Sequence, residues 1–499
     1  MDKDNFFKNS FLLTASNITT GILGFIFSIY LSKVLGAEGM GLYNLVMPIY
    51  NLFICLMSAG IVASISKISA VYAQKGEHNN IVKTIRVLAI FNVTWALLVG
   101  ITVFLTAPII GKYGINDTRT INAIKVICPA MICIAISNIF KGYFYGTSKI
   151  TVPAIIDICE KAMRIITVSI LIFLSNAQTL ESMVTLATVA LCIGEFQSLF
   201  FLYIYYKYSI KKMPVSYEKP ESSSQLLFDI IIISIPLCIN GFLTNIIGTL
   251  CTLIVPRRLL IAGFDYSQSL SMIGKFNGMA LCIITIPMIV VSTINTLLIP
   301  DLSQTINQGK EYEASLRIRK VIKLAFLLGL STTIICNIVP TELGQMFFGR
   351  NDLGNYIRFS SFSAPIIYTS LTMFGILNGL NKQGIILRNS LIEALIELVC
   401  LYIFTSIHSI NILGYSISMC IACSVSFILN IHEVNKHIDI NINEYNIIIY
   451  ILLGLLVFLV ISVFSKYFST YFPTLNNFVV IGITFLIFTY LGGFGETES

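Results

Sequence analysis

The stretch AIIDICEKAMRIIT, residues 154–167, places four charged side chains inside a run that otherwise suits lipid. A lone charge near the centre of a bilayer costs about 2.5–3.5 kcal/mol on insertion scales, so four without partners would cost about 10 kcal/mol. Asp157, Glu160, Lys161 and Arg164 fall on one face of a helix, because they are spaced by about one and two helical turns. The spacing predicts two pairs with the acid one turn before the base, Asp157 with Lys161 and Glu160 with Arg164.

Two interpretations explain such a face. A buried ion-pair network can join neighbouring helices and have no other role. Alternatively, the face lines a water-filled cavity, where the charges are hydrated and can bind a polar ligand. A second copy of this helix, described below, favours the cavity.

The rest of the chain has the composition of a protein that crosses the membrane many times. Of its 499 residues, 56% are hydrophobic and 11% are charged, and the mean hydropathy is +0.84. Soluble domains contain about 25% charged residues. Apolar runs of about 20 residues recur along the chain, and each is long enough to cross a hydrocarbon core about 30 Å thick as a helix. We expect an all-α membrane protein with about fourteen transmembrane helices, the first closed by Gly36. The expected spans are 10–32, 41–66, 84–107, 121–146, 152–174, 180–206, 226–254, 270–299, 321–340, 356–380, 385–407, 410–431, 445–465 and 477–493.

Basic residues indicate the orientation of these helices. Most Lys and Arg residues fall in loops on the same side as the two termini, and membrane proteins carry their excess of basic residues in the cytoplasm. We therefore expect a multi-pass protein of the bacterial cell membrane with both termini cytoplasmic. The net charge of +7 has the same origin and does not indicate nucleic acid. Most cysteines lie in apolar runs, where a thiol behaves as a small hydrophobe, and we expect no metal site and no cofactor.

The chain contains an internal repeat. Residues 41–160 align without gaps on residues 274–393, and five glycines meet five glycines where chance gives about 0.5. Among them, Gly142 and Gly146 match Gly375 and Gly379, a small-residue pattern that lets helices approach closely. Because the two copies have the same orientation, they predict two parallel six-helix lobes around a central cavity, followed by two extra helices. The expected parts are 1–206, the N-lobe; 207–225, a cytoplasmic linker; 226–432, the C-lobe; and 433–499, the extra helices with a cytoplasmic tail.

The second copy carries different charges at the matched helix. Glu393 and Glu397 are again one helical turn apart, without basic residues beside them. A network that only joins helices would keep its cations in both copies, so the difference favours a cavity. Further polar residues near the ends of spans could contact a substrate: Asn44, Arg257, Arg258, Lys275 and Asn277.

The arginine pair has two interpretations. Arginine suits phosphate, because its planar guanidinium binds two oxygens at once. Arg257 and Arg258 could instead anchor a helix by reaching the outer headgroups.

Two parts of the chain resemble a known family. The first is LSKVLGAEGMGLYNLVMPIYNLFICLMSAGIVASISKISA, residues 31–70, with its G-x-E-G-x-G-L-Y and P-I-Y elements. The second is IVPRRLLIAG, residues 254–263, followed by FNGMALCIITIPMIVVSTINTLLIPDLS, residues 276–303. Both resemble the polysaccharide-transport branch of the multidrug/oligosaccharidyl-lipid/polysaccharide (MOP) exporter superfamily, the branch of stage V sporulation protein B.

The resemblance implies a function. Such a protein is a flippase that moves an undecaprenyl-pyrophosphate-linked peptidoglycan precursor, or a related polysaccharide unit, between leaflets by alternating access. It would serve cell-wall or spore-cortex synthesis in a sporulating bacterium. Members hold the diphosphate in a cationic central cavity, but the first helix of this chain lacks the usual basic residues. That role therefore falls to Arg257, Arg258, Lys161 and Arg164. The implied partners are the lipid-linked saccharide, membrane lipids and a coupling cation, and we expect a monomer.

Two alternatives stay open. A multidrug exporter of the same superfamily would use Asp157, Glu160, Glu393 and Glu397 to couple cations to its cargo. A membrane-embedded glycosyltransferase or acyltransferase would need acidic or histidine groups at the bilayer surface. Because the extramembrane segments are no longer than about 20 residues, we expect a transporter and no enzyme.

Overall fold

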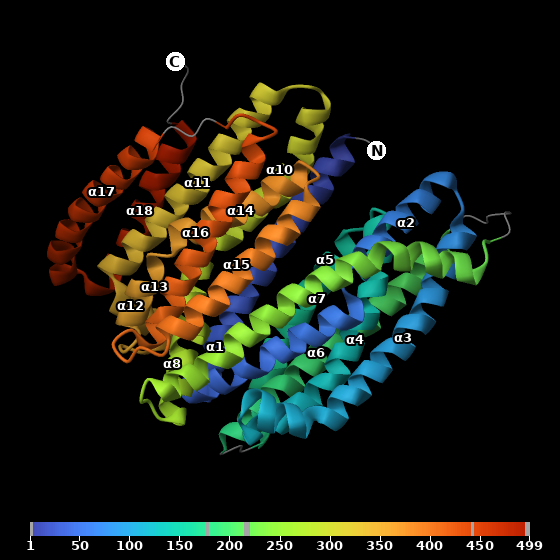
Figure 1. The fold of residues 1–499 in the computed structure, drawn as a ribbon, viewed down its shortest axis with the longest axis horizontal. Helices are drawn as coiled ribbons and strands as arrows, with labels where there is room; N and C mark the ends of the chain where they lie inside the picture. The colour runs from blue at the N-terminus through green and yellow to red at the C-terminus, as the bar shows by residue number, and fades with distance from the viewer. Residues whose placement is uncertain (1–2, 176–178, 214–219, 441–443, 495–499) are drawn as a thin grey trace. The chain divides into compact units, whose positions relative to one another are not determined.

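The computed structural model describes residues 3–175, 179–213, 220–440 and 444–494, and it contains only helices within those ranges (Figure 1). By their contacts, residues 1–253 form one compact unit and residues 254–499 a second. The helices are α1 Lys3–Ser58, α2 Ile61–Lys75, α3 His78–Ile109, α4 Ile121–Gly146, α5 Thr151–Ser175, α6 Leu180–Lys211, α7 Ser223–Ile261, α8 Tyr266–Lys275, α9 Leu281–Thr285, α10 Met288–Asn307, α11 Glu311–Ile338, α12 Pro340–Phe348, α13 Gly354–Ser361, α14 Ala364–Gly379, α15 Gln383–Phe404, α16 Gly414–Asn435, α17 Glu444–Tyr471 and α18 Pro473–Phe494, with short π or 3₁₀ turns η1 Ile110–Ile115, η2 Thr118–Thr120, η3 Phe276–Ala280 and η4 Asn411–Leu413.

The first two expected spans are joined in α1. Their junction is Gly36, whose φ of 67° and ψ of −173° interrupt the helical backbone. A φ in this range favours glycine, because a side chain would clash with the backbone. The break predicted at Gly36 is confirmed, although no loop follows it.

Fewer helices qualify as spans by length and composition than the fourteen expected. Among the described residues, nine do so alone, and α13 with α14, bent by 50°, brings the number to ten. The expected spans α5 and α15 carry several charges, and the span expected at 270–299 is divided into α8, η3, α9 and α10. The apolar part of α18 is short. The expected spans that do not qualify are therefore charged, broken or short helices. The count of fourteen stays a prediction.

Each unit packs its matched helices in the same pairs. In the first unit, α4 packs against α2, α3 and α6, and α5 packs against α6. In the second, α14 packs against α10, α11 and α16, and α15 packs against α16. The extra helices α17 and α18 both pack against α11. The pairwise packing thus follows the sequence repeat.

The matched glycines lie where these helices touch. A Cβ on Gly146 would stand 2.5 Å from the carbonyl oxygen of Ser66, on α2. A Cβ on Gly379 would stand 3.0 Å from the side chain of Leu302, on α10. The predicted close approach at these small residues is confirmed in both copies.

The division between the units differs from the expected linker. It falls at residues 253 and 254, inside α7, and not within 207–225. The first half of α7 packs on unit one: Leu226 and Ile230 belong to its core, and a Cβ on Gly60 would stand 2.8 Å from the backbone of Ser234. Of the linker, residues 214–219 lie outside the described residues.

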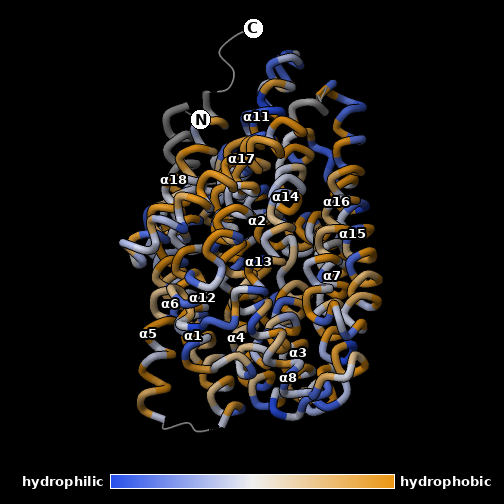
Figure 2. Tube along the Cα trace, turned by 90° about the vertical axis from the view of Figure 1, so that its left-hand side faces the viewer, coloured by the Kyte–Doolittle hydropathy of each residue, from blue (hydrophilic) through white to orange (hydrophobic). Residues whose placement is uncertain are grey.

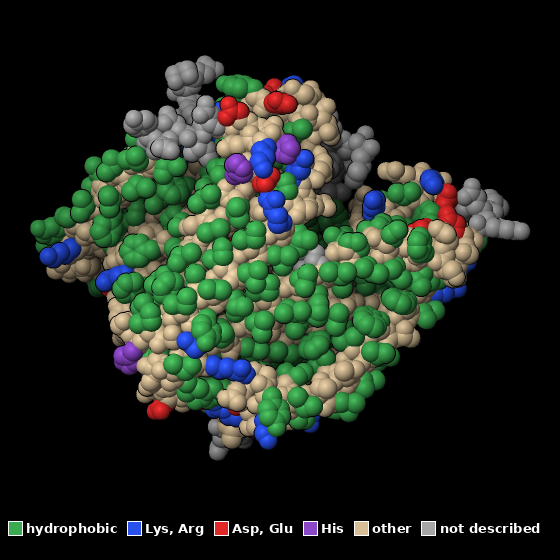
Figure 3. Space-filling view, viewed as in Figure 1, with side chains coloured by type: hydrophobic (Ala, Val, Ile, Leu, Met, Phe, Trp, Pro, Cys, Tyr) green, Lys and Arg blue, Asp and Glu red, His purple; other side chains and the backbone are tan. Residues whose placement is uncertain are grey.

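The helices present apolar surfaces to their surroundings. Figure 2 shows hydrophobic residues along most helices and hydrophilic residues gathered at many helix ends and turns. In Figure 3, hydrophobic side chains cover much of the visible face, with charged side chains mainly near its edges. Large exposed residues such as Phe173 and Leu459 would be unusual on a soluble protein but suit contact with lipid.

Candidate functional site

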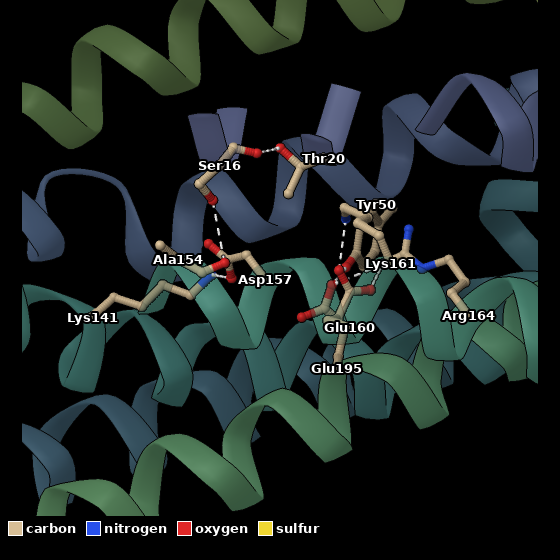
Figure 4. A network of polar contacts seen from close by, with 10 residues as sticks. All are labelled: Ser16, Thr20, Tyr50, Lys141, Ala154, Asp157, Glu160, Lys161, Arg164 and Glu195. Atoms are coloured by element: carbon tan, nitrogen blue, oxygen red, sulfur yellow. Dashed lines mark hydrogen bonds and ion pairs between the residues drawn. The ribbon is translucent and has the colours of Figure 1, made fainter. Parts of the chain in front are cut away.

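The charged face of α5 packs into the first unit (Figure 4). Arg164 Nη2 binds Oε1 of Glu160 and lies 3.1 Å from Oε1 of Glu195, on α6. Lys161 Nζ lies 2.8 Å from Oε2 of Glu160. The Tyr50 hydroxyl, on α1, donates to Glu195 Oε1 over 3.3 Å. One guanidinium thus joins two carboxylates from neighbouring helices.

One of the two predicted pairs is wrong. Asp157 binds Lys141 of α4, with 2.7 Å between Oδ1 and Nζ, and does not pair with Lys161. Lys161 pairs instead with its sequence neighbour Glu160. A cation on the adjacent helix takes the place of the one on the same helix, which spacing along one helix cannot reveal. The pair of Glu160 with Arg164 is confirmed.

Burial divides the four charged residues into two kinds. The side chains of Glu160 and Arg164 are 5% and 11% exposed, as in an ion-pair network that joins helices. Those of Asp157 and Lys161 are 30% and 33% exposed, so they can reach solvent or a ligand. The cavity interpretation therefore stays a proposal, and it applies to these two residues better than to the buried pair.

Sequence reasoning missed Glu195 and Lys141. Each is an isolated charge in an apolar helix. Because such a charge is costly in the membrane without a partner, its presence alone could have indicated that both residues belong to the ion-pair network. With them included, three acids and three bases form one balanced set: Lys141, Asp157, Glu160, Lys161, Arg164 and Glu195.

The matched helix of the second unit is not balanced. Neither Glu393 nor Glu397 has a basic partner within the described ranges. Glu393 accepts a hydrogen bond from the Cys423 thiol at 3.4 Å, and Ser426 lies beside it, both on α16. In the repeat, Glu397 occupies the position that Arg164 holds in the first unit. Two carboxylates without a cation are the arrangement that binds a proton or a metal cation.

The matched asparagines carry unused polar atoms. In the part of the chain that the structure describes, the Nδ2 of Asn44 and the Oδ1 of Asn277 are buried without a hydrogen-bond partner. Asn277 lies in the π-helical turn η3, a kind of turn that is frequent at functional sites. Because a buried amide atom without a partner costs about 1–3 kcal/mol, both residues are candidates to bind a ligand.

The remaining basic candidates lie in the second unit. Arg257 is exposed, whereas the guanidinium of Arg258 stacks 3.8 Å from the centroid of the Tyr402 ring, and its Nε donates to the Tyr402 carbonyl. Arg258 is thus held by Tyr402 on α15. Lys275 binds Asp352, with 2.7 Å between Nζ and Oδ2.

Asp352 belongs to the loop between α12 and α13. It receives two hydrogen bonds from Arg350 as well as the ion pair from Lys275. The Arg350 bonds, followed by those of Lys275, hold the pKa of Asp352 below its usual range. Lys275 therefore fastens the end of α8 to this loop.

Sequence relatives and solved structures identify the chain. The family of polysaccharide biosynthesis proteins matches residues 6–306, which is more than half of the chain. The chain belongs to that family. The polysaccharide biosynthesis protein is 26% identical to stage V sporulation protein B of Bacillus subtilis (strain 168) over 89% of its own length and 87% of the relative. It is 22% identical to the lipid II flippase MurJ of the same organism, over 79% of its length and 76% of the relative.

Solved structures agree on the fold. The chain matches a lipid II flippase MurJ in an inward closed conformation with a TM-score of 0.71 and 14% identity, over 96% of this chain and 98% of that one. It matches an inward-facing multidrug resistance MATE transporter of the MOP superfamily with a TM-score of 0.68 and 13% identity, over 86% and 98%. The chain is thus a multi-pass membrane protein of the polysaccharide biosynthesis family, and it shares its fold with these flippase and transporter structures.

Proposed function

We propose that the protein is a flippase for a lipid-linked saccharide. The observation that carries this proposal is its similarity, over most of both chains, to a protein named as a lipid II flippase. The proposed cargo is an undecaprenyl-pyrophosphate-linked peptidoglycan precursor or a related polysaccharide unit, which moves between leaflets by alternating access. The similarity to stage V sporulation protein B supports use in spore-cortex or cell-wall synthesis.

Exposed and unpartnered polar groups would bind the head group. Arg257 is exposed, and Lys161 keeps a third of its side chain accessible while it pairs with Glu160. Both suit a diphosphate, which needs cations that can reach it. Asn44 and Asn277 would bind sugar hydroxyls or phosphate oxygens through their unused amide atoms. Arg164 and Arg258 would act indirectly, since neighbouring side chains already occupy their guanidinium groups.

Glu393 and Glu397 would bind the coupling cation. Their carboxylates lie on one helix without basic partners in the described chain, so a cation that enters from solvent neutralises charge that is costly in the membrane. The balanced network of α5 offers no such deficit. We propose a monomer in the cell membrane, with both termini in the cytoplasm.

The same carboxylates favour one second candidate, a cation-coupled multidrug exporter. A deficit of positive charge on a transmembrane helix suits cationic drugs as well as coupling ions. The relatives with known names are a flippase, a transporter and a sporulation protein, so we do not propose a membrane-embedded transferase.

A leaflet assay separates the two transport functions. Proteoliposomes that contain the purified protein are loaded with a fluorescent lipid-linked peptidoglycan precursor in one leaflet, or with a cationic dye in the lumen. We expect movement of the precursor above protein-free vesicles and no movement of the dye. Movement of the dye alone would replace the proposed function by drug export.

A further inference from the structure

A chain of hydrogen bonds runs between α15 and α16 and ends beside Glu393. Arg388 Nε donates to Asn389 Oδ1 at 3.1 Å, and Asn389 Nδ2 donates to Asn430 Oδ1 at 2.7 Å. Asn430 Nδ2 then donates to Ser426 Oγ at 3.3 Å. Ser426 lies beside Glu393, whose carboxylate accepts from the thiol of Cys423, also on α16, at 3.4 Å. The hydrogen bonds thus cross from α15 to α16 at the two asparagines.

All of these bonds run in one direction. Each asparagine accepts through its oxygen on the side of Arg388 and donates through its nitrogen on the side of Glu393. Since the oxygen of Ser426 accepts from Asn430, its O–H is left to donate, and the Glu393 carboxylate lies beside it. Aligned bonds polarise one another, so each strengthens the next. The side-chain dipoles of the chain therefore point their positive ends from Arg388 toward Glu393.

The middle of the chain is buried and its outer end is not. Asn389, Ser426 and Asn430 are fully buried, each with 0% exposure. Arg388, whose side chain is 55% exposed, binds Glu433 with 2.8 Å between Nη2 and Oε1. Apolar side chains of the same shape would pack here at little or no loss of stability, so three buried polar residues need another explanation.

We propose that Asn389, Asn430 and Ser426 are positioning residues that hold the Glu393 carboxylate toward α16 for cation binding. This inference rests on the proposed function, in which Glu393 and Glu397 bind the coupling cation. Groups that orient a ligand side chain change metal affinity by about 10–100-fold when they are removed. Sodium and the proton share the chemistry of a cation on a carboxylate, and the experiment below separates them.

Few other titratable groups lie close enough to Glu393 to change when the same cation binds. The titratable neighbours of Glu393 are Glu397 on α15 and Cys423 on α16. On α14, which also packs against α15, Tyr368 donates its hydroxyl to the carbonyl of Ile284. A carboxylate signal that disappears in E393Q but persists in E397Q therefore belongs to Glu393 itself.

Infrared difference spectroscopy on the purified full-length protein tests the inference without transport. In one series sodium chloride is added at constant pH, and in the other the pH is changed without sodium. We expect a carboxylate stretching band that responds in one series, identifies the cation, and is absent from E393Q. In S426A and N430L, the cation concentration that gives half of the change should differ from wild type at least tenfold. In S426T, which keeps the hydroxyl, this concentration should lie within about twofold of the wild-type value.

The control is S424A. Ser424 lies on the same helix but donates to the Cys420 carbonyl over 2.7 Å, outside the chain of hydrogen bonds, so its loss should leave the response unchanged. The inference is overturned if S426A responds like wild type, or if no wild-type band depends on Glu393. S426A is nearly isosteric, so this result does not depend on whether N430L folds. A wild-type response that changes in S426A, in a protein that moves no lipid-linked precursor, would reject the proposed function alone.

Discussion

Arg164 is the residue on which the ion pairs of the first unit converge. It binds Glu160 and Glu195, and Lys161 neutralises Glu160 from its other oxygen. Removing one member of a buried ion pair costs more than the pair contributes, because the remaining charge stays buried without a partner. In this site Glu160 would keep Lys161, whereas Glu195 would lose its cation and keep the Tyr50 hydroxyl.

We predict that Arg164→Ala lowers the free energy of unfolding by about 3–5 kcal/mol. Replacing the whole group, with Arg164→Leu, Glu160→Gln and Glu195→Gln together, should recover much of that loss because no charge is stranded. Thermal unfolding in detergent measures both variants. If the Arg164→Ala protein has the same melting temperature as the wild type, the ion pairs of Arg164 are dispensable for stability.

Removing a charge from the carboxylates of α15 should not lower the stability of the protein, in contrast to Arg164→Ala. Glu397→Gln removes a half-buried charge that has no basic partner in the described chain and keeps the shape of the side chain, so we expect an unchanged or higher melting temperature. Lipid-linked precursor transport in the leaflet assay should fall at least tenfold, because a coupling site is lost. The matched control is Glu342→Gln, an exposed carboxylate on α12, which should transport normally. Normal transport by Glu397→Gln would exclude Glu397 from coupling.

At the scale of elements, glycines decide how closely the helices of each copy approach. The contact of α2 with α4 at Gly146 is tighter than the contact of α10 with α14 at Gly379: the nearest backbone oxygen would stand 2.5 Å from an added Cβ at Gly146 and 3.3 Å from one at Gly379. Added methyl groups at well-packed positions cost about 1–3 kcal/mol.

We predict that Gly146→Ala destabilises the protein by about 1–3 kcal/mol and that Gly379→Ala has a smaller effect. Gly24 provides the control, because it is also helical but no atom lies within 4 Å of the place that an added methyl group would take. Gly24→Ala should be neutral or slightly stabilising, because alanine favours a helix. Melting temperatures in the same detergent compare the three variants, and equal losses at Gly146 and Gly24 would contradict the packing argument.

The ion pairs of Asp352 predict that the stability of the folded protein depends on pH. The pKa of Asp352 is lowered in the folded protein, so the stabilisation is complete above its unfolded pKa of about 3.9 and is lost as the pH falls toward the lower folded value. Since Asp352 is 42% exposed, we expect less than about 1 kcal/mol. The melting temperature of Asp352→Asn should lie slightly below wild type at pH 7 and approach it below pH 4. A constant difference across this range would contradict the assignment.

At the scale of the whole molecule, the orientation in the membrane depends on the distribution of basic residues. From this distribution we expect the ends of α6 and α16 in the cytoplasm and the loop between α12 and α13 outside. The proposed directions of cargo and cation follow from this orientation.

Reporter fusions test the orientation. Green fluorescent protein fused after Ser499 should fluoresce, and alkaline phosphatase at the same position should be inactive. Alkaline phosphatase inserted after Gly349, in the loop that follows α12, should be active. Active phosphatase at Ser499 would reverse the topology and with it the inner side assigned to Arg388.

Helix positions could be predicted because apolar length and breakers act locally. The span expected at 121–146 coincides with α4, and the interruption at Gly36 follows from one backbone angle. The partner of Asp157 could not be predicted, since Lys141 reaches it from another helix. The packing of α7 could not be predicted for a related reason. Its first half packs on unit one, and the hydropathy of a helix does not show which neighbours it contacts.

The exchange of Arg164 for Glu397 at equivalent positions sets the two copies apart. The two copies are not interchangeable, because α5 carries a balanced ion network whereas the matched α15 carries two carboxylates without basic partners in the described chain. A synthetic chimaera built from two N-terminal halves should therefore insert and pack, yet lack the acidic centre.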